Sequence, residues 1–219
     1  MQTRRVRGAD WLVPGMTALA LCLLAPLPAG AQAPVPEGSE FQVNTYSVFF
    51  QAFPSAAVDA DGDFVVVWSG DVSTGTDTGS LSIQGQRYAS DGSAQGAQFQ
   101  VNTYTTNSQY RPSVAVNADG DFVVVWESYG SSGTDTAYRS VQGQRYASDG
   151  STRGAQFEVN TYTTNVQRNP SVAAAANGNF AVVWQSYGSS GTDTSGYSIQ
   201  GQRYSSGGST QGAEFQVNT

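Results

Sequence analysis

The side chains that most enzymes use for covalent or proton-transfer chemistry are scarce in this sequence of 219 residues. It contains no His and no Lys, and its one Cys, Cys22, lies in a leader that we expect to be removed. Serine–histidine and cysteine–histidine catalysis, Schiff-base chemistry and histidine-ligated zinc are therefore excluded from the mature chain. A pair of carboxylates can hydrolyse a glycosidic bond, but most aspartates here lie in turns repeated in tandem, which would not assemble one asymmetric pair. We expect no enzyme activity, and Glu127 and Glu158 are the carboxylates to examine if hydrolysis is found.

Three aspartates at alternate positions, Asp59, Asp61 and Asp63, surround Gly62. Carboxylates with this spacing can gather oxygen ligands for Ca²⁺. The equivalent positions later in the chain hold Asn117, Asp119 and Asp121, and then Ala175, Asn177 and Asn179. Because the charge is lost while turn-forming residues persist, the pattern favours a hairpin turn. A single weak calcium site in the first copy is the alternative, and we expect no other cofactor.

A further candidate site lies in a loop rich in Gly, Ser and Thr. The motif Gly-Thr-Asp-Thr occurs three times, and in the last two copies a tyrosine opens the loop, with Tyr129 before Asp135 and Tyr187 before Asp193. Loops on a repeat scaffold commonly carry function, and Tyr with Asp and Thr is suited to stack on and hydrogen-bond to a sugar. The alternative, which we favour, is that Asp and Thr satisfy the backbone of the loop itself.

All of these motifs belong to an internal repeat of 58 residues, which Phe41, Phe99, Phe157 and Phe215 mark. Three copies cover 41–98, 99–156 and 157–214, a linker precedes them at 32–40, and 215–219 is the start of a further, truncated copy. A repeat of this length indicates a solenoid, a propeller or another tandem array.

Four short strand patterns occur in each copy. In the second copy, 113–116 leads through a turn at 117–120 to the continuous apolar run 122–126, and 141–146 and 157–161 follow. The apolar run predicts a strand buried on both faces, whose final Trp belongs to the core. The last two segments alternate with a period of two and predict half-buried outer strands.

These patterns predict an all-β fold of three tandem four-stranded antiparallel blade-like units, which is a partial or open β-propeller. Three blades are fewer than the four to eight that close a ring. The chain is therefore an open arc with ends suited to self-association, or it pairs with another copy, or it is a fragment of a longer array. On the third strand, Arg87, Arg145 and Arg203 recur, and we expect them to pair with Asp between blades.

The N-terminus has the layout of a secretory signal peptide. Arg4, Arg5 and Arg7 precede an apolar run at 16–27 and small residues at 29–31, so we expect cleavage after Ala31 and a secreted or cell-surface protein. The run is broken by proline and too short to span a membrane. Removal of 1–31 leaves 7 Arg against 16 Asp and Glu. This charge disfavours nucleic acid and anionic membranes as partners, and we expect no membrane insertion after cleavage.

The motifs at 112–115, 119–126, 144–150 and 99–103 together resemble a repeat of secreted bacterial surface proteins. The resemblance covers about 41–219 and implies a propeller-like array of the kind found beside calcium-binding or adhesion modules, with no catalytic residue set. It implies a secreted, non-catalytic structural or interaction module that meets a protein or glycan at the cell surface. The alternative is a lectin-like, carbohydrate-binding module, with or without calcium.

Overall fold

The structure, a computed structural model, describes residues 38–47, 49–71, 75–77, 79–131, 133–136, 138–189 and 191–218. The predicted signal peptide and most of the predicted linker lie outside these residues. The part of the chain from Phe41 to Thr219 forms one unit. Within the described residues, no helix is both long and apolar enough to cross a membrane.

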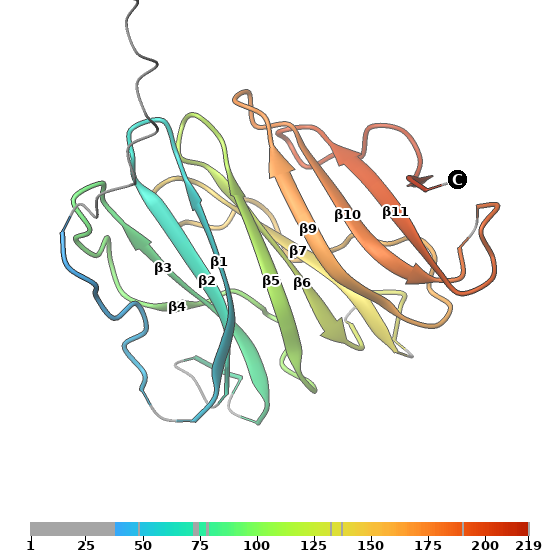
Figure 1. Cartoon of the computed structure of the whole chain (residues 1–219), viewed down its shortest axis with the longest axis horizontal. Helices are drawn as coiled ribbons and strands as arrows, with labels where there is room; N and C mark the ends of the chain where they lie inside the picture. The colour runs from blue at the N-terminus through green and yellow to red at the C-terminus, as the bar shows by residue number, and fades with distance from the viewer. Residues whose placement is uncertain are drawn as a thin grey trace, which may run out of the picture. The chain divides into compact units, whose positions relative to one another are not determined.

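The described strands form three four-stranded antiparallel sheets, each in chain order, here called blades 1, 2 and 3 (Figure 1). This confirms the predicted all-β, partial propeller-like fold. Blade 1 contains β1 (Gln51–Val58), β2 (Phe64–Asp71), β3 (Leu81–Tyr88) and β4 (Phe99–Gln100); blade 2 contains β5 (Gln109–Val116), β6 (Phe122–Tyr129), β7 (Arg139–Tyr146) and β8 (Phe157–Glu158); blade 3 contains β9 (Gln167–Ala174), β10 (Phe180–Tyr187), β11 (Tyr197–Tyr204) and β12 (Phe215–Gln216).

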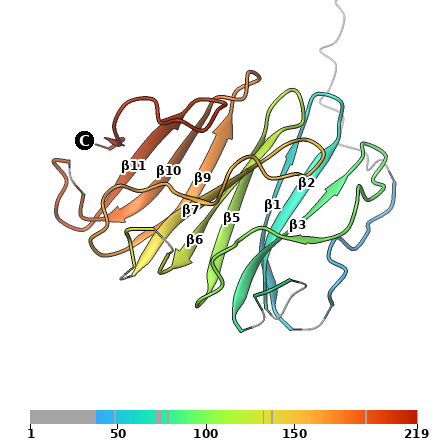
Figure 2. The same ribbon diagram turned by 180° about the vertical axis from the view of Figure 1, so that it is seen from behind.

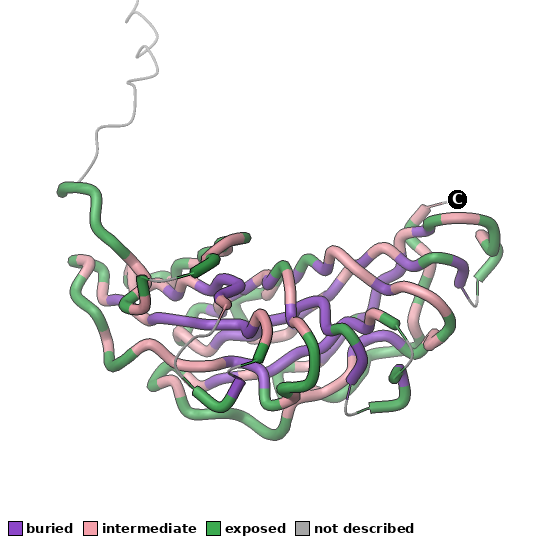
Figure 3. The backbone as a smooth tube through the Cα atoms, turned by 90° about the horizontal axis from the view of Figure 1, so that it is seen from below, coloured by how far each residue is buried: buried purple, intermediate pink, exposed green. Residues whose placement is uncertain are grey.

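The blades stand side by side, and the first strand of each contacts the first strand of the next, so that β5 lies between β1 and β9 (Figure 2). Two apolar clusters fill the spaces between them. Val67 and Ile83 of blade 1 belong to the same cluster as Val124 and Trp126 of blade 2. Blades 2 and 3 are joined by the equivalent cluster around Trp184. Figure 3 shows the buried backbone running through the middle of this arrangement.

The second strand of the middle blade is buried on both faces, as predicted. Seven of the eight residues of β6 are buried, whereas β10 alternates between buried and half-buried residues. The difference arises because β6 has a blade on each side, while β10 has one on one side only. Trp126 and Trp184 are 0% and 1% exposed, which confirms that these rings belong to the core.

The third strands differ from the prediction of half-buried strands. Gln142 and Gln144 on β7 are each 1% exposed. Gln142 donates to the Ser140 hydroxyl at 3.0 Å, and Gln144 donates to the Gly154 carbonyl at 3.0 Å. The alternating glutamines therefore mark buried, hydrogen-bonded amides rather than a face turned to solvent.

The segment that opens the third repeat belongs structurally to two blades. Phe157 pairs with Gly143 of β7 as part of the fourth strand of blade 2, and its ring lies 5.7 Å from that of Tyr204 in blade 3. This strand is two residues long instead of the five predicted. It ends there because Asn160 offers its side-chain oxygen, and not its backbone, to the Val141 N–H at 2.7 Å.

Each first strand is bent by a register shift near its middle. Phe53, Arg111 and Asn169 lie within or beside these shifts and have φ of 55°, 48° and 52°, a left-handed conformation that is uncommon outside glycine. An extra residue of this kind bends a strand and increases its twist. The three blades thus share one irregularity in the strands that lie nearest one another.

Candidate functional site

The aspartate of the Gly-Thr-Asp-Thr loop of blade 1 is built into the contact with blade 2. Asp77 is 1% exposed, and its Oδ2 accepts a hydrogen bond from Asn102 at 2.9 Å. With its amide oriented to satisfy the network, Gln109 of β5 donates to the same oxygen at 2.8 Å. Burial raises the pKa of Asp77 to about 6, although the Asn102 hydrogen bond acts in the opposite direction. The side chain therefore fastens its loop to the next blade.

The same contact recurs in the copies from which a sugar site was predicted. Asp135 is buried and accepts from Asn160 at 3.0 Å, and the half-buried Asp193 accepts from Asn218 at 2.9 Å. Glu158 accepts from the Asp135 N–H at 3.1 Å and so ties the loop to the fourth strand. These contacts join each aspartate side chain to an asparagine that follows it by 25 residues, and the sugar site stays a prediction.

The two predicted tyrosines lie at the surface. Tyr129 and Tyr187 are the last residues of β6 and β10 and are 45% and 46% exposed. Tyr187 pairs across the sheet with Tyr197, and their rings meet edge-on at 5.1 Å. The guanidinium of Arg168 lies 4.1 Å from the centre of the Tyr197 ring. Blade 3 therefore carries an exposed aromatic pair with a cation beside it.

Sequence reasoning missed Tyr197 and Arg168 as members of this group. The pairing of β10 with β11 places Tyr197 opposite Tyr187, and the pairing with β9 places Arg168 opposite Gln185. The available signal was the strand register, which the variable loop between the two strands obscures. We call Tyr187, Tyr197 and Arg168 the blade 3 aromatic group.

Glu127 is held inside the junction of blades 2 and 3. Its side chain is 0% exposed, and it accepts from Arg139 at 2.5 Å and from the Asn169 N–H of β9 at 3.2 Å. Arg111 lies 3.6 Å from its second oxygen. The two arginines compensate its charge and the backbone contact reaches the neighbouring blade, which is an arrangement suited to cohesion.

The predicted calcium ligands occupy a turn. Asp59 accepts from the N–H groups of Asp61 and Asp63, each at 3.0 Å. Asp63 in turn accepts from the Ser90 N–H and from Gln95. Within the described part of the chain, no group of three or more His, Cys, Asp or Glu side chains is placed to hold a metal ion. The observed contacts are those of a hairpin turn, which the sequence pattern favours.

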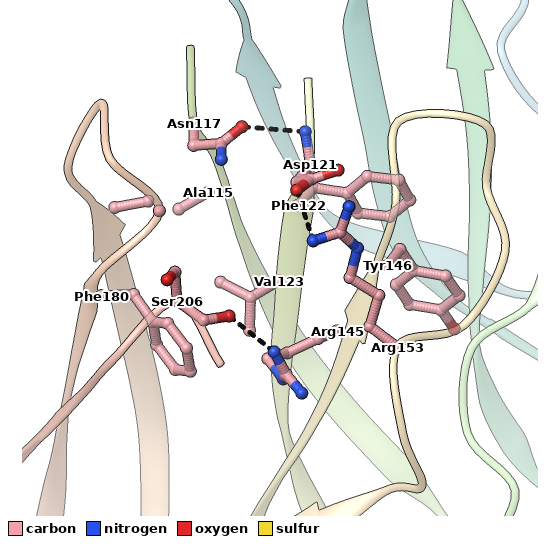
Figure 4. A pocket seen from close by; sticks show the side chains of 12 residues that line it. Ala115, Asn117, Asp121, Phe122, Val123, Arg145, Tyr146, Arg153, Phe180 and Ser206 are labelled. Atoms are coloured by element: carbon pink, nitrogen blue, oxygen red, sulfur yellow. Dashed lines mark hydrogen bonds and ion pairs between the residues drawn. The ribbon is translucent and has the colours of Figure 1, made fainter. Parts of the chain in front are cut away.

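A pocket of about 350 Å³, including the open space at its mouth, lies between blades 2 and 3 at their turn end (Figure 4). Arg145 crosses it to donate to the Ser206 carbonyl at 2.7 Å, and Arg153 pairs with Asp121 at 2.8 Å. A similar pocket of about 320 Å³ lies between blades 1 and 2, where Arg87 donates to the Ser148 carbonyl. The pockets are a recurring feature of blade packing.

These contacts correct the expectation of Arg–Asp pairs between blades. Arg87 and Arg145 bind backbone carbonyls in the turn of the following blade. Asp121 is instead paired with Arg153 of its own blade. The third-strand arginine is therefore a link to the main chain of the next blade, and Arg87 also interacts electrostatically with Asp149 there.

No protein-family model and no curated protein matches this sequence. Among solved structures, the chain is similar to the Hadza microbial sialidase Hz136, with a TM-score of 0.53 and 12% identity over 77% of this chain and 37% of that one. It is also similar to an endo-arabinase from Bacteroides thetaiotaomicron VPI-5482, with a TM-score of 0.47 and 17% identity over 77% and 63% of the chains. A third similar structure is the Bacillus subtilis arabinanase Arb43A, with a TM-score of 0.44 and 16% identity over 77% of this chain and 59% of that one.

The chain thus spans between 37% and 63% of the length of these structures. At identities of 17% or less, the similarity concerns the fold and assigns no activity. The chain has a partial propeller-like fold, and its similarity to the sialidase structure concerns that fold alone.

Proposed function

We propose that this chain is a secreted, non-catalytic structural or interaction module. One observation carries the proposal: recurring polar side chains of the repeat are engaged in contacts that hold the blades together. Asp77 fastens a loop to the next blade, Glu127 accepts from the next blade's backbone, and Arg145 donates to a carbonyl there. A general acid or nucleophile must instead offer an oxygen to the substrate.

The predicted signal peptide and the acidic mature chain support a place outside the cell or on its surface. The resemblance of the repeat to that of secreted bacterial surface proteins supports an adhesion-type role with a protein or glycan partner. Repeats of this kind form extended surfaces on a rigid scaffold, which suits recognition of a large partner.

Carbohydrate binding is a second candidate, and the blade 3 aromatic group is the observation that favours it. Tyr187 and Tyr197 are both about half exposed, and Arg168 adds a cation and hydrogen-bond donors beside them. An aromatic ring with polar neighbours can stack on a sugar and hydrogen-bond to its hydroxyls. Tyr129 places a comparable ring at the same position of blade 2.

A glycan array, run with and without Ca²⁺, distinguishes the two functions. The variants are the Tyr129→Ala/Tyr187→Ala double variant and, as a control, Phe49→Ala, which removes a ring that is 69% exposed in the first copy. Specific binding that is lost in the double variant and kept in the control supports the lectin-like function. Silence on the array, together with binding to cells or to a protein, supports the scaffold. A requirement for Ca²⁺ would direct attention to Asp59, Asp61 and Asp63, and hydrolysis of a glycan would overturn both proposals.

A further inference from the structure

The two junctions between blades use the same ridge and the same groove. The ridge of blade 1 contains Val67 and Ile83, which are both 0% exposed beneath blade 2. The groove that receives it contains Val124 and Trp126. Blade 2 offers the equivalent ridge, with Val125 and Val141 also 0% exposed, to the groove of blade 3, which contains Val182 and Trp184.

At the two ends of the array, the same ridge and groove lack a neighbouring blade, although Trp68 of the end groove is only 4% exposed. On blade 3, the equivalent ridge residues Val183 and Ile199 are only half-buried. On blade 1, Val66 of the groove is half-buried as well. A mostly apolar cavity of about 420 Å³, including open space, lies in this groove between Val43 and Ala52 and is lined further by Pro54, Val66 and Trp68.

The groups that make the polar contacts of the junctions are also present on the end faces of blades 1 and 3. The Ser55 hydroxyl accepts from the Val114 N–H at 3.3 Å, and the Ser113 hydroxyl accepts from the Val172 N–H at 3.2 Å. Blade 3 has Ser171 at this position, and the matching N–H on blade 1 belongs to Ala56. In the same way, Arg203 is the equivalent of Arg87 and Arg145, and the Ser90 carbonyl is the equivalent of their acceptors.

From this repetition we propose that the ridge of blade 3 docks into the groove of blade 1 of a second copy of this chain. The occupant follows from the established junctions, since the two end faces carry the surfaces that already bind one another twice within the chain. Head-to-tail contacts close into a ring or grow into a filament. Two copies of the three described blades supply six, which is the only multiple of three within the four to eight of closed propellers.

Docking requires one short strand to move. Phe41 packs on Tyr88 of blade 1, with ring centres 5.4 Å apart, as Phe99 packs on Tyr146. Phe215 pairs with Gly201, as Phe99 pairs with Gly85. When the two copies join, the ring of Phe41 from one copy and that of Phe215 from the other compete for one position. Segment 41–46 precedes β1, which begins at Gln51, so it stays in place, pairs with β11 of the other copy, and displaces 215–218.

Sedimentation velocity of the mature chain tests the docking. The wild type is expected to form a dimer, and Val183→Asp or Val66→Asp to be monomeric. Each of these two variants keeps one intact face, so an equimolar mixture is expected to regain the dimer through a single wild-type junction. Thr210→Asp is the matched control. Its equivalent in blade 2, Thr152, is exposed although that blade has a neighbour on each side, so the position takes no part in a junction. Circular dichroism verifies that each variant is folded, and Ala52→Glu replaces Val66→Asp if that variant is not.

Three results would overturn the proposal: a monomeric wild type, a Val183→Asp variant that remains dimeric, or folded variants that stay monomeric when mixed. A chain that ends at Glu214 tests the strand displacement separately. Because this chain lacks the competing segment, its association constant is expected to rise roughly tenfold or more. An unchanged or lower constant would show that segment 215–218 is not displaced.

Discussion

At the scale of the residue, Asp77 of the Gly-Thr-Asp-Thr motif has a side chain that could bind a ligand but instead holds two blades together. Its carboxylate is removed from water and faces amide donors from two neighbouring segments. Burial disfavours the charged carboxylate more than the hydrogen bond from Asn102 favours it, which is why the pKa of Asp77 is raised to about 6. The stability of the blade junction should therefore respond to pH through this group.

The sign of that response follows from the pKa values. The unfolded carboxyl has a pKa of about 3.9, so the folded state holds this proton more tightly, and its stabilising effect is present below about pH 4 and lost as pH rises through about 6. Urea denaturation at pH 4 and pH 7 should show this loss in the wild type and not in Asp77→Asn. Asp91 serves as the control. Hydrogen bonds from Ser93 lower its pKa, so its contribution to stability changes with pH in the opposite direction. An equal pH dependence in wild type and Asp77→Asn would contradict the assignment.

The buried tryptophans set the energetic scale of the same junction. Trp126 is 0% exposed between blades 1 and 2, so Trp126→Ala should lower the free energy of unfolding by about 3–5 kcal/mol. Tyr187→Ala, at an exposed position, should change it by less than about 0.5 kcal/mol. Chemical denaturation measures both, and a near-wild-type value for Trp126→Ala would place that ring at the surface.

At the scale of the element, the second and third strands follow from their patterns and the fourth does not. The apolar run 122–126 and the alternating run 141–146 both lie in strands, because hydrophobic period and turn residues are local properties. The burial of Gln142, which accepts from Gln156, and the shortness of β8 depend on partners from other segments, which no local pattern contains. The left-handed backbone of Phe53, Arg111 and Asn169 could not be predicted either, because none of these positions is a glycine.

The glycine in the middle of each third strand has an element-scale role. A Cβ on Gly143 would lie 2.6 Å from the Phe157 ring that crosses to blade 3, so Gly143→Ala should cost about 1–3 kcal/mol through overpacking. Gly79, which has nothing within 4 Å of its Cβ position, is the control, and Gly79→Ala should be close to neutral. Thermal unfolding compares the two, and equal midpoints would show that the ring does not need this space.

At the scale of the whole molecule, the repeat period predicted the three blades and their open ends. The candidate sites were predicted less completely. Tyr129 and Tyr187 are exposed as expected for a binding surface, whereas Asp135 lies in a buried hydrogen bond with Asn160. The reason is that an aspartate in a polar loop has the same sequence signature whether its partner is a ligand or the next blade. Only the packing of one copy on another distinguishes the two.

A glycan hydrolysis assay on the purified mature chain is the most direct test of the proposal that this module is non-catalytic and that its polar residues hold the blades together. The chain is incubated with a panel of glycans, and the products are analysed by mass spectrometry beside a Glu127→Gln variant. Because Glu127 is enclosed by Arg111, Arg139 and the backbone of Asn169, we predict that every glycan remains intact. A glycan that is cleaved by the wild type and left intact by a folded Glu127→Gln variant would contradict the proposed function.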